Sequence, residues 1–232
     1  MTEKNSGPEE GIKGVVEDVK GKAKETVGTV TGRDDMVREG KAQQDKADAQ
    51  HCRDVVARTV EELGGLDILV NNVAYQNPTE DFTDISDEQW RRTFSVNIDS
   101  YFRVTKAALA HLPDGGAVVN TGSINGLRGN KTLIDYSATK GAILALTYSL
   151  AQSLADRRIR VNCVAPGPVW TPLIPATMDA EKTESFGEQT PFGRAAQPDE
   201  IAPSYVFFAS GTMSSYYRGE VLAPIGGETL PG

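Results

Sequence analysis

Apolar residues beyond position 50 fall into short runs that alternate with longer stretches of helical periodicity. The runs predict four strands that are apolar on both faces, as buried parallel strands are: Leu66–Val70, Ala117–Gly122, Ile159–Pro166 and Gly219–Gly227. The longer stretches predict helices over Ser86–Leu112, Leu133–Asp156 and Pro198–Ser210, the first opened by the capping-box pattern SDEQ. This alternation predicts an α/β domain with a parallel sheet of about four strands and helices on both faces.

The first 50 residues have a different pattern, with no aromatic residue, few apolar ones and glycines at positions 7, 14, 21 and 28. Such a segment has too little apolar surface to fold alone, so we expect a polar segment that is frayed helix or disordered. We therefore divide the chain into residues 1–50 and an α/β domain over residues 51–232. A helix over Gln50–Leu63 is expected to cover one face of the first strand.

Composition narrows the function classes. The 232 residues include 32 acidic and 24 basic ones, a net charge of −8, and no basic stripe that could follow a nucleic-acid backbone. The start lacks the apolar core of a secretory signal, and no apolar run reaches the roughly 18 residues of a membrane span. We expect a cytoplasmic protein with no membrane or nucleic-acid partner. The cysteines and histidines are scattered, so no metal site is predicted.

Tyr136 and Lys140 are four residues apart in a predicted helix, so they share one face and the ammonium lies beside the phenol. A nearby positive charge favours phenolate, so we expect the pKa of Tyr136 to be lowered toward neutrality. Ser123 follows a predicted strand and supplies a second hydroxyl. Hydride addition to a carbonyl leaves charge on oxygen, and two such donors could stabilise and protonate it.

This segment resembles the short-chain dehydrogenase/reductase superfamily, and the resemblance covers residues 51–232. Further family motifs occur in order: NNVA at Asn71–Ala74, VN at Val96 and Asn97, and PGPVWT at Pro166–Thr171. The resemblance implies a Rossmann-like doubly wound sheet, here partial, and an NAD- or NADP-dependent oxidoreductase. Its substrate would be a small-molecule aldehyde or ketone, or an alcohol in the reverse direction.

By the same resemblance, Tyr136 is the general acid and base, Ser123 hydrogen-bonds the carbonyl oxygen, and Lys140 holds the nicotinamide ribose. Asn97 would position a water in a proton relay; a purely structural role, with its amide satisfied within a helix, is the competing interpretation. The implied cofactor-binding residues are Asn71, Tyr136, Lys140, Pro166, Gly167, Val169 and Thr171. Thr171 could equally cap a turn. The proline-interrupted stretch Gly167–Pro191 is expected to be a mobile flap over the site.

The chain departs from the superfamily pattern at its start. Residues 21–50 resemble the CsbD-like stress-response family, and the glycine-rich TGxxxGxG turn that receives the pyrophosphate has no match upstream of Leu66. We therefore expect weakened cofactor binding, and a first strand, Leu66–Val70, that lies at an exposed sheet edge. The two long helices make a homo-oligomer plausible by analogy with related reductases.

Two functions follow. One is an NAD(P)-dependent oxidoreductase that uses Asn97, Ser123, Tyr136 and Lys140. The other is a non-catalytic fusion or deletion product, with a stress-protein-like head and a reductase remnant that oligomerises. Substrate identity and the choice between NAD and NADP are not encoded in any motif of this sequence.

Overall fold

The structure, a computed structural model, describes residues 7–228, with side chains from residue 17 on. Four strands form one sheet in chain order, all parallel: β1 (Ile68–Asn71), β2 (Ala117–Thr121), β3 (Arg160–Val164) and β4 (Val221–Leu222). The helices are α1 (Gly7–Thr31), α2 (Asp34–Leu63), α3 (Asp87–Phe94), α4 (Ser100–Ala108), α5 (Ile124–Arg128), α6 (Ile134–Ser153), α7 (Leu173–Thr177), α8 (Ala180–Glu184) and α9 (Pro198–Ala209). A short 3-10 turn, η1 (Phe82–Asp84), precedes α3. The predicted α/β class and four-stranded parallel sheet are confirmed.

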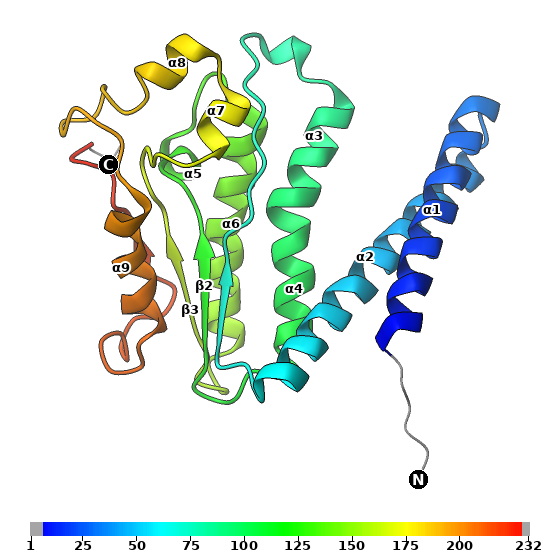
Figure 1. The fold of residues 1–232 in the computed structure, drawn as a ribbon, viewed down its shortest axis with the longest axis horizontal. Helices are drawn as coiled ribbons and strands as arrows, with labels where there is room; N and C mark the ends of the chain where they lie inside the picture. Colours follow the sequence, from blue (N-terminus) through cyan, green and yellow to red (C-terminus); the bar gives the residue numbers. More distant parts are fainter. Residues whose placement is uncertain (1–6, 229–232) are drawn as a thin grey trace. The chain divides into compact units, whose positions relative to one another are not determined.

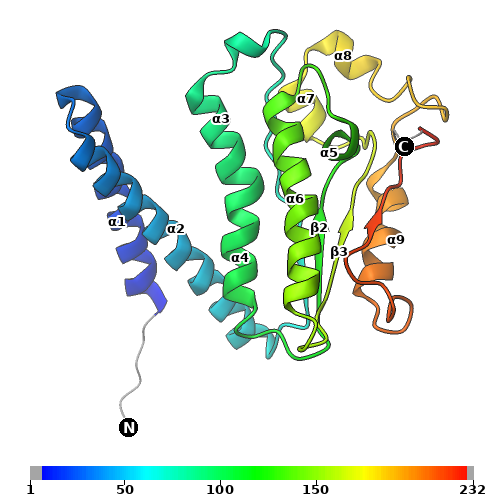
Figure 2. The same cartoon turned by 180° about the vertical axis from the view of Figure 1, so that it is seen from behind.

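The centre of the sheet is covered on both faces, and every residue of β2 and β3 is buried. Successive side chains of a strand point to opposite faces, so Cys163 and Val164 mark the two sides. Cys163 packs with Ile143 of α6 in one apolar cluster, and Val164 packs with Phe208 of α9 in another. Helices α6 and α9 therefore cover opposite faces of the same strands (Figures 1 and 2).

β1 forms one edge of the sheet and pairs with β2 alone among the described strands. Its side chains Ile68 and Val70 are 43% and 46% exposed, in contrast to the buried valines of β2. The exposed edge expected for this strand is thus confirmed. Its apolar residues are typical of a strand that is covered on both faces.

The predicted helix over Ser86–Leu112 is continuous in space but changes its winding. α3 is capped by Ser86, whose Oγ accepts the Gln89 backbone N–H at 3.1 Å. It continues into a π-helical turn, η2 (Ser95–Asp99), and then into α4. The π-helical turn changes the spacing of the apolar residues too little for the sequence to reveal it. No described helix combines the length and apolarity needed to cross a bilayer.

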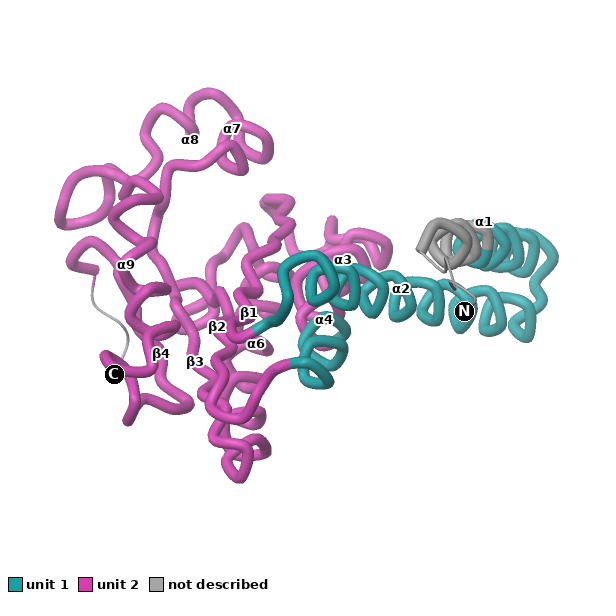
Figure 3. The backbone as a smooth tube through the Cα atoms, turned by 60° about the horizontal axis from the view of Figure 1, so that its bottom comes forward, with its two compact units in different colours: residues 1–66, 103–111 teal, residues 67–102, 112–232 magenta. Residues whose placement is uncertain are grey.

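The described residues form two compact units, each with its own contacts (Figure 3). One comprises the chain up to Leu66 with Arg103–His111, and the other comprises Asp67–Phe102 with the chain from Leu112 on. The boundary predicted near residue 50 falls inside α2, which runs unbroken from Asp34 to Leu63. The composition changes there, but helix continuity depends on backbone hydrogen bonds, so a change in side-chain chemistry does not end the element.

Within the first unit, α1 and α2 form an antiparallel hairpin held by very small residues. Gly21 and Gly28 on α1, and Gly40 and Ala47 on α2, are buried, and each pair is spaced by seven residues. A Cβ on Gly40 would lie 2.5 Å from the Glu25 backbone nitrogen. Of the two expectations for this segment, helix or disorder, the structure shows helix over the described part. Glycines that weaken an isolated helix here permit close backbone packing.

We predict that Gly40→Leu opens this hairpin, because no space exists for its side chain against α1. The overpacking should cost about 1–3 kcal/mol of local stability and speed hydrogen exchange over residues 34–47. Ala42→Leu, on the exposed side of the same helix, is the control and should leave exchange unchanged. Equal exchange in the two variants would contradict the close packing of α1 and α2.

Candidate active site

A cavity of about 710 Å³ lies at the carboxyl ends of β1, β2 and β3. Parallel strands bring these ends to one edge of the sheet, where the segments that follow them converge. Ser123, Tyr136 and Lys140 all line this cavity. The sequence predicted that these three groups share one target, and the structure brings them together.

Each group is held by a different local device. Ser123 directly follows β2 and caps the short helix α5, with its Oγ accepting the Asn125 backbone N–H at 3.1 Å. Tyr136 and Lys140 lie one turn apart on α6 and are both buried. A strand end and a helix face thus fix the two hydroxyls and the amine relative to one another.

Lys140 is 1% exposed, and its ammonium is held by a backbone carbonyl. Nζ donates to the Thr121 carbonyl oxygen at 2.8 Å. It also lies 5.5 Å from the ring centroid of Tyr136 and 5.9 Å from that of Tyr101. Burial disfavours the charged form and lowers the pKa of Lys140 to about 8. Lys140 therefore remains mainly protonated at neutral pH.

The pKa of Tyr136 is raised above its ordinary value, in the direction opposite to the one expected from the sequence. Burial is the main cause, and a hydrogen bond with Ser123 offsets part of it. Helical spacing brought Lys140 alongside, but its Nζ hydrogen-bonds to Thr121 rather than to the phenol. Tyr136 is thus a protonated phenol at neutral pH, which suits a proton donor.

Asn97 lies outside the cavity lining, within the π turn η2, and is fully buried. Its Oδ1 accepts the Tyr75 backbone N–H at 2.6 Å, and its Nδ2 donates to the Tyr75 carbonyl at 2.8 Å. Nδ2 also donates to Thr139 Oγ1 at 3.0 Å. The side chain therefore brackets the segment after β1 and ties it to α6, so its amide is satisfied by other elements rather than within its own helix.

Asn71 is likewise directed away from the cavity. Its Nδ2 donates to Asn120 Oδ1 at 2.9 Å, a buried bond between β1 and β2. The next residue, Asn72, lines the cavity and accepts a 2.9 Å hydrogen bond from Thr121 Oγ1. Asn72, one position beyond the predicted residue, thus supplies the polar group at this wall.

The segment after β3 forms the opposite wall, and four of the predicted cofactor-binding residues line it: Pro166, Gly167, Val169 and Thr171. The backbone here is fixed, because Gly167 N–H donates to the Pro224 carbonyl at 3.0 Å. Tyr136 and Lys140 line the same cavity, so its residues could hold a nicotinamide and its ribose, which need an apolar wall and donors for hydroxyl groups. Among the described residues, the other cation at the cavity is Arg128, which pairs with Glu228 at 3.2 Å.

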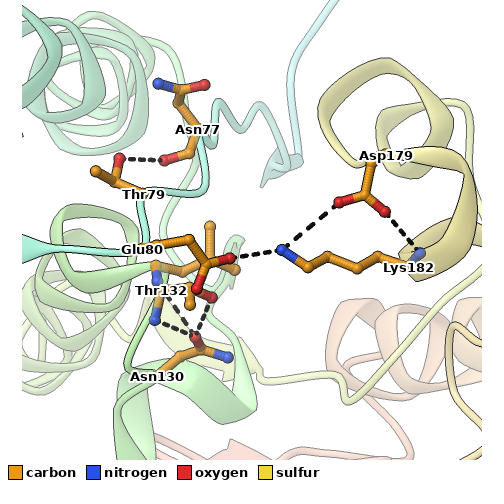
Figure 4. A network of polar contacts seen from close by, with 8 residues as sticks. Asn77, Thr79, Glu80, Asn130, Thr132, Asp179 and Lys182 are labelled. Atoms are coloured by element: carbon orange, nitrogen blue, oxygen red, sulfur yellow. Dashed lines mark hydrogen bonds and ion pairs between the residues drawn. The ribbon is translucent and has the colours of Figure 1, made fainter.

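The stretch Gly167–Pro191 contributes α7 and α8 and many cavity-lining residues, as predicted for a segment over the site. Two polar contacts join it to the loop after β1. Gln76 Nε2 donates to Thr177 Oγ1 at 2.8 Å, and Lys182 Nζ pairs with Glu80 at 2.6 Å (Figure 4). The second pair is exposed, so solvent screens it strongly.

Sequence reasoning missed several cavity residues whose positions depend on distant contacts. Tyr205 of α9 places its hydroxyl 2.8 Å from Thr121 Oγ1, across 84 residues of sequence. Burial raises the pKa of Tyr205 to about 12, so it stays protonated. Polar residues of loops, of α5 and of the flap also line the cavity: Gln76, Asn125, Asn130 and Gln189. No local motif marks these residues.

Comparisons with known proteins find relatives among reductases and dehydrogenases. A family model described as "Enoyl-(Acyl carrier protein) reductase" matches residues 7–229. The "NADPH-dependent aldehyde reductase 1, chloroplastic" of Arabidopsis thaliana is 49% identical over 78% of this chain and 63% of its own length. The "Glucose and ribitol dehydrogenase" of Daucus carota is 49% identical over 78% of this chain and 62% of its own.

A solved structure from Brucella melitensis, described as a short-chain dehydrogenase/reductase and glucose/ribitol dehydrogenase, matches with a TM-score of 0.70 at 34% identity. The match covers 79% of this chain and 73% of that one. The chain thus spans less than two thirds of the length of the two curated relatives.

The pKa of Lys140 predicts how stability depends on pH. Its pKa is 10.5 when unfolded and about 8 when folded, so the unfolded chain binds more protons between these values. The free energy of unfolding should therefore rise with pH from about 8 to 10, by up to about 3 kcal/mol relative to Lys140→Met.

Urea unfolding at a series of pH values measures this difference. Lys182→Met is the control, because its partner Glu80 raises the pKa of Lys182 above 10.5 and outside the window. If the free energies of unfolding of wild type and Lys140→Met change with pH in parallel, Lys140 keeps its ordinary pKa.

Proposed function

Because this chain belongs to the short-chain dehydrogenase/reductase family, we propose that it is an NAD(P)-dependent oxidoreductase that reduces an aldehyde or ketone, or oxidises the corresponding alcohol. One observation carries the proposal: Ser123, Tyr136 and Lys140 line a single cavity with the wall formed by Pro166–Thr171. A family resemblance without this convergence would support the fold alone.

In the reductive direction, Tyr136 donates its phenolic proton to the carbonyl oxygen as negative charge develops there. The raised pKa of Tyr136 keeps that proton in place at neutral pH. Ser123 donates a second hydrogen bond to the same oxygen. Lys140, anchored by the Thr121 carbonyl, supplies a positive charge that stabilises the phenolate left behind.

The cofactor supplies the hydride when it is bound. Tyr136 and Lys140 would hold its nicotinamide ribose, and Pro166, Gly167, Val169 and Thr171 would line the nicotinamide. On the β1 side we assign cofactor contact to Asn72, which reaches the cavity, rather than to Asn71. The sequence has no glycine-rich turn upstream of β1, so we propose that the adenosine and pyrophosphate contribute less affinity here than in a full dinucleotide fold.

The polar lining supports a proposal for the substrate class. Amide side chains at Gln76, Asn125 and Gln189 can each donate and accept, a set suited to hydroxyl groups. Asn130, whose Oδ1 already accepts from Thr132 and Leu133, can add its Nδ2 as a donor. The relatives are described as an aldehyde reductase and as a glucose and ribitol dehydrogenase. We therefore propose a small hydroxylated aldehyde or the matching polyol as substrate.

We assign Asn97 a positioning role, because it bonds to both the Tyr75 segment and α6. A water relay at Asn97, the homo-oligomer, the cytoplasmic location and the CsbD-like nature of residues 21–50 stay predictions. No contact among residues 7–228 favours the non-catalytic alternative, and cofactor binding by the purified chain separates it from the enzyme.

Tyr136→Phe should lower carbonyl reduction at least about 1000-fold, because it removes the proton donor while keeping the ring. Fluorescence titration with NADH and NADPH should give Kd values within a few-fold of wild type for this variant. Tyr148→Phe, on the exposed part of α6, is the matched control. Absence of nicotinamide binding by wild-type protein at millimolar concentration would overturn the proposed function and favour the non-catalytic alternative.

The reductive rate should be nearly constant below pH 8 and fall above it. Lys140 loses its charge as pH passes about 8, while Tyr136 remains protonated through this range. Above the pKa of Lys140, kcat should decline by up to about tenfold per pH unit. A profile of kcat between pH 6 and 9.5 tests this, and a rate that climbs across pH 8 would contradict the assigned role of Lys140.

A further inference from the structure

A completely buried carboxylate lies beside the proton donor. Asp135 immediately precedes Tyr136 in the first turn of α6 and is 0% exposed. It does not line the cavity and has no place in the proposed chemistry. A buried charge is costly unless its oxygens are hydrogen-bonded, so the contacts of Asp135 should show what it does.

Three donors satisfy the carboxylate, and all are uncharged. Thr93 Oγ1 donates to Oδ2 at 2.7 Å, and Gln89 Nε2 donates to the same oxygen at 3.2 Å. The Tyr136 backbone N–H donates to Oδ1 at 2.8 Å. Asp135 therefore joins α3, which carries Gln89 and Thr93, to the backbone of the residue that bears the phenol.

The start of α6 needs this contact, because its N-cap residue is Leu133, which has no side-chain acceptor. The first N–H groups of a helix have no intrahelical partner and are normally capped by a polar side chain. Here Asp135 caps the Tyr136 N–H from within the first turn, and its charge is favourable at a helix N-terminus.

Gln89 extends the link toward the cavity. In a capping box its amide would turn back to the cap residue. Instead Nε2 donates to the Asn77 carbonyl at 3.1 Å and to Thr79 Oγ1 at 3.1 Å, and Oε1 accepts from Asn77 Nδ2 at 2.8 Å. Asn77 directly follows Gln76, which lines the cavity. The carboxylate thus connects the helix of Tyr136 with the loop that forms one cavity wall.

We propose that Asp135 is a positioning residue: through Thr93 and Gln89 it sets the first turn of α6 and hence the place of the Tyr136 phenol relative to Ser123 and the cavity wall. The proposal rests on the proposed function for its catalytic consequence, but its structural part concerns Tyr136 alone. Proton transfer depends on placement within about 1 Å, so loosening this turn should lower the rate of the chemical step more than binding.

Asp135→Asn keeps the shape of the side chain but replaces one acceptor oxygen with a donor that faces other donors. It should lower kcat by about 10- to 100-fold and change KM and the Kd for NADPH less than threefold. Thr93→Val, which removes the hydroxyl, should act in the same direction. Thr93→Ser keeps the hydroxyl and should restore kcat to within about threefold of wild type.

Arg160→Gln is the control for a purely structural role. Arg160 is also a buried charge with neutral partners: it donates to the Phe208 and Ala209 carbonyls and to Ser214 Oγ, outside the cavity lining. Its loss should lower the melting temperature without changing kcat. If Asp135→Asn and Arg160→Gln lower the melting temperature alike and both keep the wild-type kcat, Asp135 has only a structural role and the proposal is wrong.

A measurement without turnover separates this proposal from the proposed function. NMR of protein labelled at tyrosine Cζ, with the Tyr136 signal assigned by Tyr136→Phe, reports the surroundings of the phenol in any folded variant. Asp135→Asn and Thr93→Val should shift that signal, whereas Thr93→Ser and Arg160→Gln should not. An inactive wild-type protein with these shifts would refute the enzyme and support the positioning; an unmoved signal in Asp135→Asn would overturn the positioning.

Discussion

The parallel pairing of β1, β2 and β3 is the constraint on which the site depends. Because all three strands run in one direction, Asn72, Ser123 and the segment from Pro166 leave the sheet at the same edge. The cavity lies where these segments diverge, and burial of β2 and β3 on both faces keeps its floor rigid. The chemistry of Ser123 then needs only α6 to bring the phenol and the amine across it.

Helix α6 carries two buried charges of opposite sign, and neither forms an ion pair within the described chain. The ammonium of Lys140 is held by a carbonyl, and the carboxylate of Asp135 by a hydroxyl and amides. Neutral partners hold a charged group in place without neutralising it, so the charge still acts on the groups around it. The same burial that lowers the pKa of Lys140 raises that of Tyr136, which separates the two titrations.

Local pattern was sufficient for the sheet, for α6 and for the Ser123, Tyr136 and Lys140 set, because strand periodicity and i,i+4 spacing determine which side chains share a face. It was insufficient where the position of a side chain depends on a partner far along the chain. Tyr205 meets Thr121 only through the docking of α9. The direction of the Tyr136 pKa shift depends on how deeply the folded chain buries the phenol, and spacing does not specify that. In the sequence alone, the glycines of α1 are typical of helix breakers. Only the packing of α2 against them shows that they allow close contact between the two helices.

The order of the strands in the sheet, β1-β2-β3-β4, is also their order along the chain. Each strand therefore adds to the one made just before it, and none of the four waits for a later strand to be inserted between earlier neighbours. A chain emerging from the ribosome can assemble this sheet progressively, with β1 as the template for β2 and so on. The strand ends at the base of the cavity would come together as soon as β3 joins, and α9, which carries Tyr205, would complete the lining afterwards.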